Sequence, residues 1–77
     1  EKQIPTVGRI VMFTPSDNDL ECRHNGATEV PAIITRVFSE TTVNLKVMTD
    51  GSATPWRTSA IYSDEGTPYS WRWPQRV

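Results

Sequence analysis

A chain of 77 residues with a formal net charge of −1 and one cysteine excludes several classes of protein. A single cysteine cannot form an internal disulfide, which favours a reducing compartment over secretion. The near-neutral charge argues against general nucleic-acid binding, which depends on neutralising phosphates, and no apolar run is long enough to span a membrane. With 36% hydrophobic residues, we expect one small domain over residues 1–77.

The first predicted strand covers residues 7–13, where Val, Ile and Phe favour a pleated, half-buried surface. Gly8 lies near its start and predicts a bulge or a close approach of another backbone. The strand ends at Thr14-Pro15 because proline has no N–H to donate to a neighbouring strand.

Residues 16–29 show neither a helical nor an alternating hydrophobic period. Turn-forming residues crowd this segment, among them Asp17, Asp19 and the pair Asn25-Gly26. We expect a long loop, with a short hairpin closed at Asn25-Gly26 as an option within it. Long loops in compact domains are usually functional or mobile.

Two strands joined by a short polar turn form the centre of the chain, at residues 30–38 and 42–49. The second of them alternates, with one apolar face and one solvated face. The predicted inward residues are Val43, Leu45 and Val47, and the predicted outward residues are Asn44, Lys46 and Met48. Asp50-Gly51 is a strong turn signal that ends this hairpin.

A fourth strand is predicted over residues 56–62 and a fifth over residues 69–73, which Pro74 stops. No helix and no repeat is predicted. Five short strands with one long first loop predict an all-β fold, a small five-stranded antiparallel SH3-like or Tudor-like barrel. Closing the barrel would remove the exposed strand edges that a chain this small otherwise leaves open.

The tail Trp71-Arg72-Trp73 is the most unusual segment. On a strand, Trp71 and Trp73 share one face and Arg72 lies on the other. Either the two indoles complete a small core or a subunit interface, or they form a stacking platform for a base or a cation. A base stacked on an aromatic side chain gains roughly 1–3 kcal/mol.

Two further groups suit an anionic ligand. In the first, Arg57 would bond a phosphate bidentately beside Trp56 and the hydroxyls of Thr58 and Ser59. The alternative is a solvent-facing arginine in a strand. The second group lies in the long loop, where backbone N–H groups near a glycine turn would form an anion-binding concavity. Its side chains are Arg23, His24 and Asn25, and the alternative is a plain polar turn.

The sequence supports neither catalysis nor metal binding. Cys22 and His24 are the only soft ligands, whereas zinc takes four. The same pair would need a third orienting group to act as an activated nucleophile. We therefore predict a protein without catalytic residues, metal or cofactor.

Most of the chain resembles a widespread family of small proteins encoded by tailed bacteriophages. The matching segments are Arg23–Ala27, Pro31–Val37, Val43–Leu45, Asp50-Gly51, Trp56–Ser59 and Trp71–Pro74. The family often ends in W-H-W-P, and here Arg72 replaces the histidine. Small phage proteins include virion parts, such as capsid decoration or tail accessories, and anti-defence sponges. Sponges bind nucleotide immune signals without cleaving them and are commonly oligomeric.

The resemblance implies a non-enzymatic phage protein in the host cytoplasm that sequesters a cyclic oligonucleotide or an ADP-ribose derivative. The ligand-binding candidates are Arg23, His24, Asn25, Trp56, Arg57, Thr58, Ser59, Trp71, Arg72 and Trp73. The alternative is a virion or interaction module that uses the Trp-rich tail. A groove for Pro-rich or methylated peptides is a weaker option, by analogy with the barrel fold alone. Under both leading hypotheses we expect homo-oligomers, because a small core without disulfides benefits from pairing.

Overall fold

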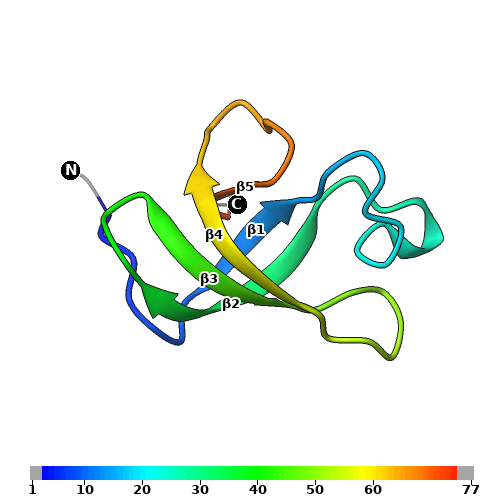
Figure 1. The fold of residues 1–77 in the computed structure, drawn as a ribbon, viewed down its shortest axis with the longest axis horizontal. Helices are drawn as coiled ribbons and strands as arrows, with labels where there is room; N and C mark the ends of the chain where they lie inside the picture. The colour runs from blue at the N-terminus through cyan, green and yellow to red at the C-terminus, as the bar shows by residue number, and fades with distance from the viewer. Residues whose placement is uncertain (1–2, 75–77) are drawn as a thin grey trace.

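The computed structural model describes residues 3–74, so residues 1–2 and 75–77 of the predicted domain lie outside the description. Five strands close into a barrel in the order β1-β2-β3-β4-β5, with β5 returning to β1 (Figure 1). The strands are β1 Ile10–Thr14, β2 Val30–Val37, β3 Thr42–Val47, β4 Trp56–Tyr62 and β5 Ser70–Arg72. The predicted all-β, five-stranded small barrel is confirmed.

Four of the five neighbouring pairs are antiparallel, and the pair β4–β5 is parallel. Ile61 and Tyr62 lie beside Ser70 and Trp71 in that pair. The connection over residues 63–69 therefore crosses over instead of making a hairpin. The same β5 residues pair antiparallel with β1, where Phe13 lies opposite Trp71. The barrel is thus mixed at its closing strand.

The core follows the alternation of each strand, because every second side chain points into the barrel. It contains Val11, Phe13, Cys22, Val30, Ala32, Ile34, Val43, Leu45, Val47, Ala60 and Trp71, all at most 2% exposed. The predicted inward residues of the third strand are confirmed. On its other face the prediction for Asn44 is wrong, since that side chain is only 8% exposed.

A β-bulge explains the burial of Asn44. Two residues of β4, Thr58 and Ser59, lie opposite Asn44 between the pairs Val43↔Ala60 and Leu45↔Arg57. The Asn44 Oδ1 accepts from the Ser59 N–H and the Thr58 hydroxyl, both at 2.9 Å. Ser59 has φ 58°, a left-handed conformation that a bulge accommodates. The amide side chain thus satisfies a backbone group that the irregular pairing leaves free.

Strand β1 begins at Ile10, three residues later than predicted. The Arg9 N–H bonds the Thr6 carbonyl at 3.2 Å, so the chain turns before the strand starts. Gly8 takes φ 95° within this turn, and its N–H donates to the Ile34 carbonyl at 2.8 Å. The expected close approach of another backbone at Gly8 is not found on the side where a side chain would lie, since a Cβ built there has no atom within 4 Å; the positive φ of the turn is what favours glycine.

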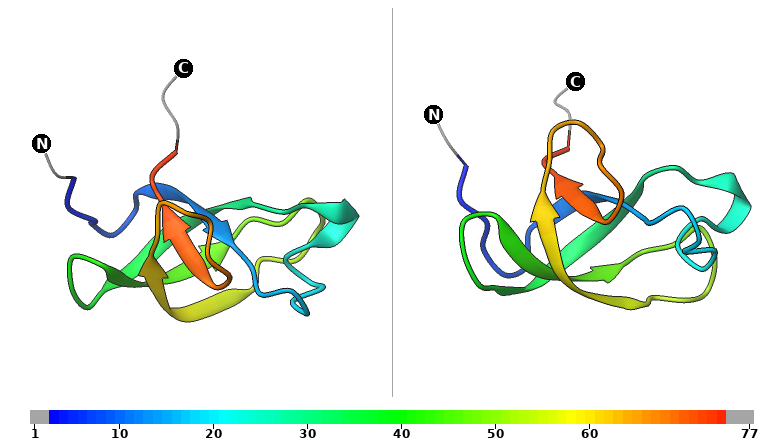
Figure 2. Two further views of the ribbon diagram at one scale, coloured as in Figure 1. Left: turned by 90° about the horizontal axis from the view of Figure 1, so that it is seen from above. Right: turned by 45° about the horizontal axis from the view of Figure 1, so that its top comes forward.

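The long loop, residues 15–29, contains a 3-10 turn, η1, at His24–Gly26 in place of the optional hairpin. Asn25 has φ 60° and Gly26 has φ 77°, so the two best left-handed formers of this segment shape the turn. Figure 2 shows the loop beside the β3–β4 connection at one end of the barrel. The Asn25 Nδ2 joins them by donating to the Asp50 Oδ2 at 2.9 Å.

Candidate functional site

The three candidates in the long loop, Arg23, His24 and Asn25, do not form one site. The Arg23 guanidinium donates to the carbonyls of Ser16 and Pro15 at 2.9 and 2.6 Å and shapes the loop, while part of its surface lines a cavity. His24 is exposed, and a Cβ on Gly51 would lie 3.0 Å from its ring. Since Asn25 also bonds the β3–β4 connection, His24 and Asn25 hold two loops together and do not line the cavities described below.

Arg57 is occupied by a carboxylate. Its Nε and Nη2 donate to the two oxygens of Asp19 at 3.0 and 2.8 Å, and these side chains are 22% and 12% exposed. Asp19 also accepts from the Cys22 N–H at 3.4 Å. The Arg57 guanidinium holds the pKa of Asp19 below its ordinary value, and burial is the main cause that raises the pKa of Cys22 to about 11. This cluster fastens the long loop to β4.

Trp56 lies on the outer surface, with 54% of its area exposed, and it contributes to neither of the cavities described below. The hydroxyl of Thr58 bonds Asn44, and Ser59 forms the bulge. The predicted group of Trp56, Arg57, Thr58 and Ser59 is therefore not assembled as a phosphate site, because Arg57 is paired with Asp19 and the Thr58 hydroxyl bonds Asn44.

Trp71 belongs to the core, at 1% exposure. Its Nε1 donates to the Thr41 carbonyl at 3.0 Å, and its ring contacts Tyr62 and Trp73 edge to face at 5.0 and 5.3 Å. The prediction that Trp71 offers a stacking surface is wrong, since no face of its indole is open. Its alternative interpretation, completion of a small core, is correct.

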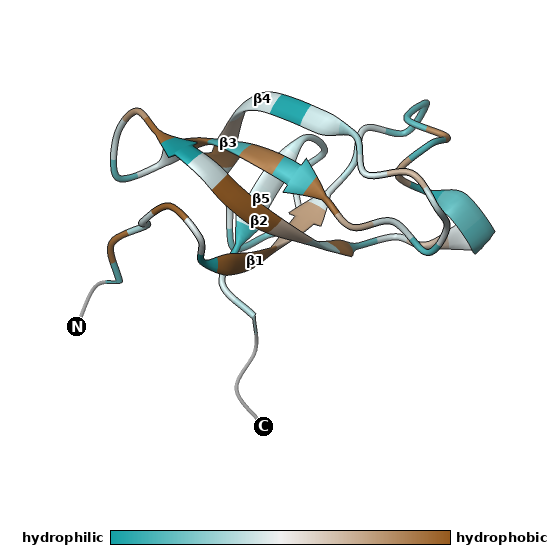
Figure 3. Cartoon of the chain, turned by 90° about the horizontal axis from the view of Figure 1, so that it is seen from below, coloured by the Kyte–Doolittle hydropathy of each residue, from teal (hydrophilic) through white to brown (hydrophobic). Residues whose placement is uncertain are grey.

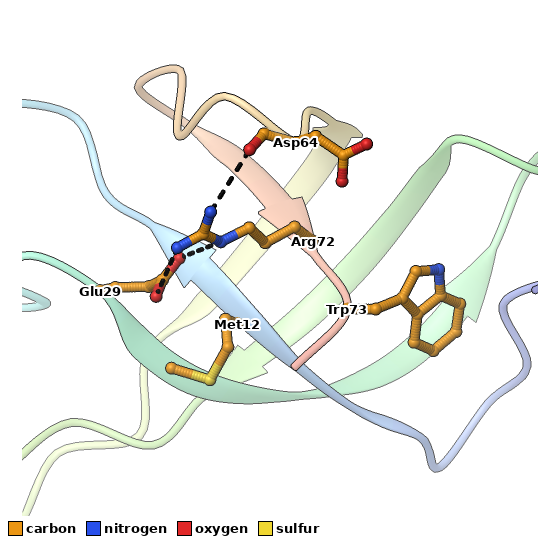
Figure 4. Close-up of a pocket in the computed structure, with 5 residues that line it drawn as sticks. All are labelled: Met12, Glu29, Asp64, Arg72 and Trp73. Carbon is orange, nitrogen blue, oxygen red and sulfur yellow. Dashed lines mark hydrogen bonds and ion pairs between the residues drawn. The ribbon is translucent and has the colours of Figure 1, made fainter. Parts of the chain in front are cut away.

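Arg72 and Trp73 are both partly exposed at the surface. The Arg72 Nε and Nη2 donate to the two Glu29 oxygens at 2.6 and 3.1 Å, and its Nη1 donates to the Asp64 carbonyl at 3.3 Å (Figure 4). The Glu29 carboxylate raises the pKa of Arg72, so this guanidinium stays charged. Trp73 is half-buried, and the Arg9 guanidinium lies 4.8 Å from its ring centroid.

Two open surface hollows have Arg72 and Glu29 as shared lining residues. The first, the Trp73 hollow, has a volume of about 260 Å³ and is lined by Met12, Glu29, Asp64, Arg72 and Trp73 (Figure 4). The second, the Arg23 hollow, has a volume of about 320 Å³ and is lined by Thr14, Arg23, Thr28, Glu29, Gly66 and Arg72. We refer to the two hollows jointly as the Arg72 groove.

One end of the groove has an indole among charged side chains, and the other end is cationic and bears hydroxyls. Of the ten predicted ligand-binding residues, the structure brings Arg23, Arg72 and Trp73 to this groove. Sequence reasoning missed its other lining residues, Met12, Thr14, Thr28, Glu29, Asp64 and Gly66. The chain has nine acidic residues, and no spacing in it marks Glu29 as the partner of Arg72. The pairing of β5 with β1 places Arg72 beside Met12, and the long loop and the connection over residues 63–69 contribute further lining residues.

Within residues 3–74, no three His, Cys, Asp or Glu side chains gather as a metal site would need. No helix in that range has the length and hydropathy to cross a membrane. No protein-family model matches the chain, and no curated protein or solved structure is significantly similar to it. Membership of a bacteriophage family therefore stays a prediction.

Proposed function

We propose that this chain is a phage-encoded protein that binds a small nucleotide signal in the Arg72 groove and sequesters it without cleavage. The observation that carries the proposal is that two hollows share Arg72 as a lining residue, one lined also by an indole and the other by a second arginine and two threonines. A nucleotide has the same two-part character, a flat base joined to an anionic phosphate.

We place the phosphate in the Arg23 hollow on the basis of its lining charges. Arg23 bonds two neutral carbonyls, and its nearest carboxylate, that of Asp17, is 3.7 Å away and 91% exposed. Two guanidinium groups therefore face one lining carboxylate, Glu29, in that hollow. Charge-assisted bonds from arginine are the strong contacts that phosphates make with proteins.

The base belongs in the Trp73 hollow. Of the residues that the structure describes, Trp73 is the one aromatic lining residue of this cavity, and we propose that the base stacks on the part of its indole that faces the cavity. We propose binding without chemistry because the described residues lining the groove include no His or Cys to serve as base or nucleophile. In the host cytoplasm, such a protein would lower the free concentration of an immune signal.

Isothermal titration calorimetry with cyclic di- and trinucleotides and ADP-ribose derivatives tests this proposal. We expect micromolar or tighter binding of at least one ligand, with a loss of about tenfold or more for Arg72→Gln and for Trp73→Leu. Arg36→Gln and Trp56→Ala are matched controls, since both side chains are exposed and neither lines the groove. The proposal fails if no ligand binds below millimolar concentration or if the controls lose as much as the groove variants.

A second candidate function is self-association through an apolar outer face. Directly paired residues form a row across four strands, Ile10↔Ile33, Ile33↔Lys46 and Lys46↔Trp56. Ile10 and Trp56 are 47% and 54% exposed. We call these four residues the outer row, and Figure 3 shows that β1 and β2, the strands that supply its two isoleucines, are largely hydrophobic. We propose this face as the interaction surface in place of the Trp-rich tail, because Trp71 is buried.

We propose a second copy of the chain as the occupant of the outer row. About a two-fold axis between Ile33 and Lys46, Ile10 of one copy would meet Trp56 of the other, and the Lys46 stem would cover Ile33. A patch of this kind is on the order of a few hundred Å², below the roughly 800 Å² per partner of a standard interface. The expected dimer is therefore weak and concentration-dependent.

Sedimentation velocity over a wide concentration range tests the dimer. Trp56→Lys should abolish any association, whereas Phe38→Lys, a side chain of similar exposure (57%) outside the row, should leave it unchanged. A strict monomer at millimolar concentration, or equal effects of both variants, would rule out this interface.

A further inference from the structure

Two carboxylates of the described residues line the Trp73 hollow, those of Glu29 and Asp64. The Glu29 carboxylate accepts hydrogen bonds from Arg72, whereas the Asp64 carboxylate accepts none from an arginine in the described part of the chain. The Asp64 Oδ1 accepts from the Tyr62 hydroxyl, and this bond raises the pKa of the phenol. The backbone carbonyl of Asp64, and not its side chain, accepts from Arg72. The Oδ2 has no partner among residues 3–74. Figure 4 shows the carboxylate turned away from the Arg72 guanidinium, on the side of the view where Trp73 lies.

The Asp64 carboxylate determines which part of a nucleotide the Trp73 hollow would accept. An open carboxylate beside an indole repels a phosphate but accepts hydrogen bonds from the N–H edge of a stacked base. Tyr62 fixes the orientation of this carboxylate, because its phenol is itself held by a ring contact with the buried Trp71 at 5.0 Å. The acceptor is therefore preorganised, in a cavity that already has one aromatic wall.

We infer that the Trp73 hollow selects guanine, with the Asp64 carboxylate accepting from the base's N1–H and 2-amino group while the ring stacks on Trp73. This inference rests on the proposed nucleotide-binding function and assigns the class of base. Guanine is the common base that presents two adjacent donors on one edge, which match the two oxygens of a carboxylate. The Oδ1 retains a lone pair for this contact while it accepts from Tyr62.

Adenine would be disfavoured at the same position. Its N1 is an acceptor, and a lone pair facing the carboxylate is repulsive, so only the 6-amino group would be satisfied. Hypoxanthine keeps the N1–H and lacks the 2-amino group, and it is therefore intermediate. Hydrogen bonds to charged groups in a partly exposed site imply a preference of roughly 10- to 100-fold for guanine over adenine.

Calorimetry with cyclic di-GMP, cyclic di-IMP and cyclic di-AMP on the full chain tests the inference. For the unmodified protein we expect affinities in that order. Asp64→Asn keeps an oxygen for the Tyr62 hydroxyl but replaces one acceptor by a donor, so it should weaken cyclic di-GMP binding about tenfold or more and spare cyclic di-AMP. Glu65→Gln, the exposed acidic neighbour, is the control and should change neither ligand.

The outcomes separate this inference from the proposed function. Binding of the three ligands with equal affinity, or a guanine preference that survives in Asp64→Asn, overturns the assignment of guanine and leaves nucleotide binding in place. Absence of binding for these ligands and for the whole panel of nucleotides overturns both. A guanine preference that disappears only in Asp64→Asn supports the inference. Circular dichroism of each variant confirms that the barrel remains folded.

Discussion

Tryptophan and arginine are adjacent at two places in the chain, Trp56-Arg57 and Trp71-Arg72-Trp73, and the two places have opposite structural roles. In Trp56-Arg57, the arginine is 22% exposed and bonded to an Asp19 that is 12% exposed, and the tryptophan faces outward. In Arg72-Trp73, the arginine side chain is 41% exposed and both residues line one cavity. The comparison teaches that a sequence motif becomes a site only where the topology places its members around a shared space.

The largest expected effect concerns the tryptophan that adjoins the second pair. Trp71→Ala removes a side chain that is 1% exposed and should cost about 3–5 kcal/mol of unfolding free energy. Trp56→Ala removes a side chain that is 54% exposed and should cost less than about 1 kcal/mol. Urea unfolding followed by circular dichroism measures both values. Equal losses would contradict the assignment of Trp71 to the core.

The second-largest expected effect is a difference in stability loss between substitutions of Arg57 and Arg72. Arg57→Gln leaves the Asp19 carboxylate, 12% exposed, without its charged partner and should lower the unfolding free energy by about 1–3 kcal/mol. Arg72→Gln should cost less stability, because its pair with Glu29 is more exposed. Urea unfolding of both variants gives the ranking, with Arg36→Gln as the exposed control. A reversed ranking would show that Arg72 and Glu29 are structural.

A pH titration sharpens the same contrast. The pKa of Asp19 is lowered from 3.8 by Arg57, so its stabilising contribution is complete above pH 3.8 and is lost as the pH falls through the native pKa. The difference in unfolding free energy between the unmodified protein and Asp19→Asn should therefore be largest near neutral pH and shrink below pH 3.8. Glu65→Gln, at an exposed acid outside the Arg57 cluster, is the matched control. A difference that is independent of pH would contradict an ionic role for Asp19.

The smallest effect concerns Glu29. Because its two oxygens occupy the Nε and Nη2 of Arg72, the phosphate of the proposed ligand would compete with this carboxylate for the guanidinium. Glu29→Gln should therefore tighten nucleotide binding by about two- to fivefold at low salt, and the gain should shrink as salt screens the repulsion. Calorimetry at two ionic strengths measures it. Weaker binding would mean that Glu29 instead positions Arg72 for the ligand.

The local patterns of the sequence determined the strands and the class of fold. The alternation of Val43, Leu45 and Val47 placed three core residues correctly, and the prolines and turn formers marked the element ends, because strand periodicity and turn chemistry are local properties. The parallel return of β5 and the bulge that buries Asn44 were not visible in these patterns.

Only the tertiary structure decided which of the tryptophans and arginines lie together. Asp19 meets Arg57 across 38 positions and Glu29 meets Arg72 across 43, and no local rule pairs such distant residues. Barrel closure places β5 beside β1, so Trp71 points into the core while Arg72 and Trp73 line the groove. The residue types of a candidate site were therefore present in the sequence, whereas their selection depended on long-range pairing and burial.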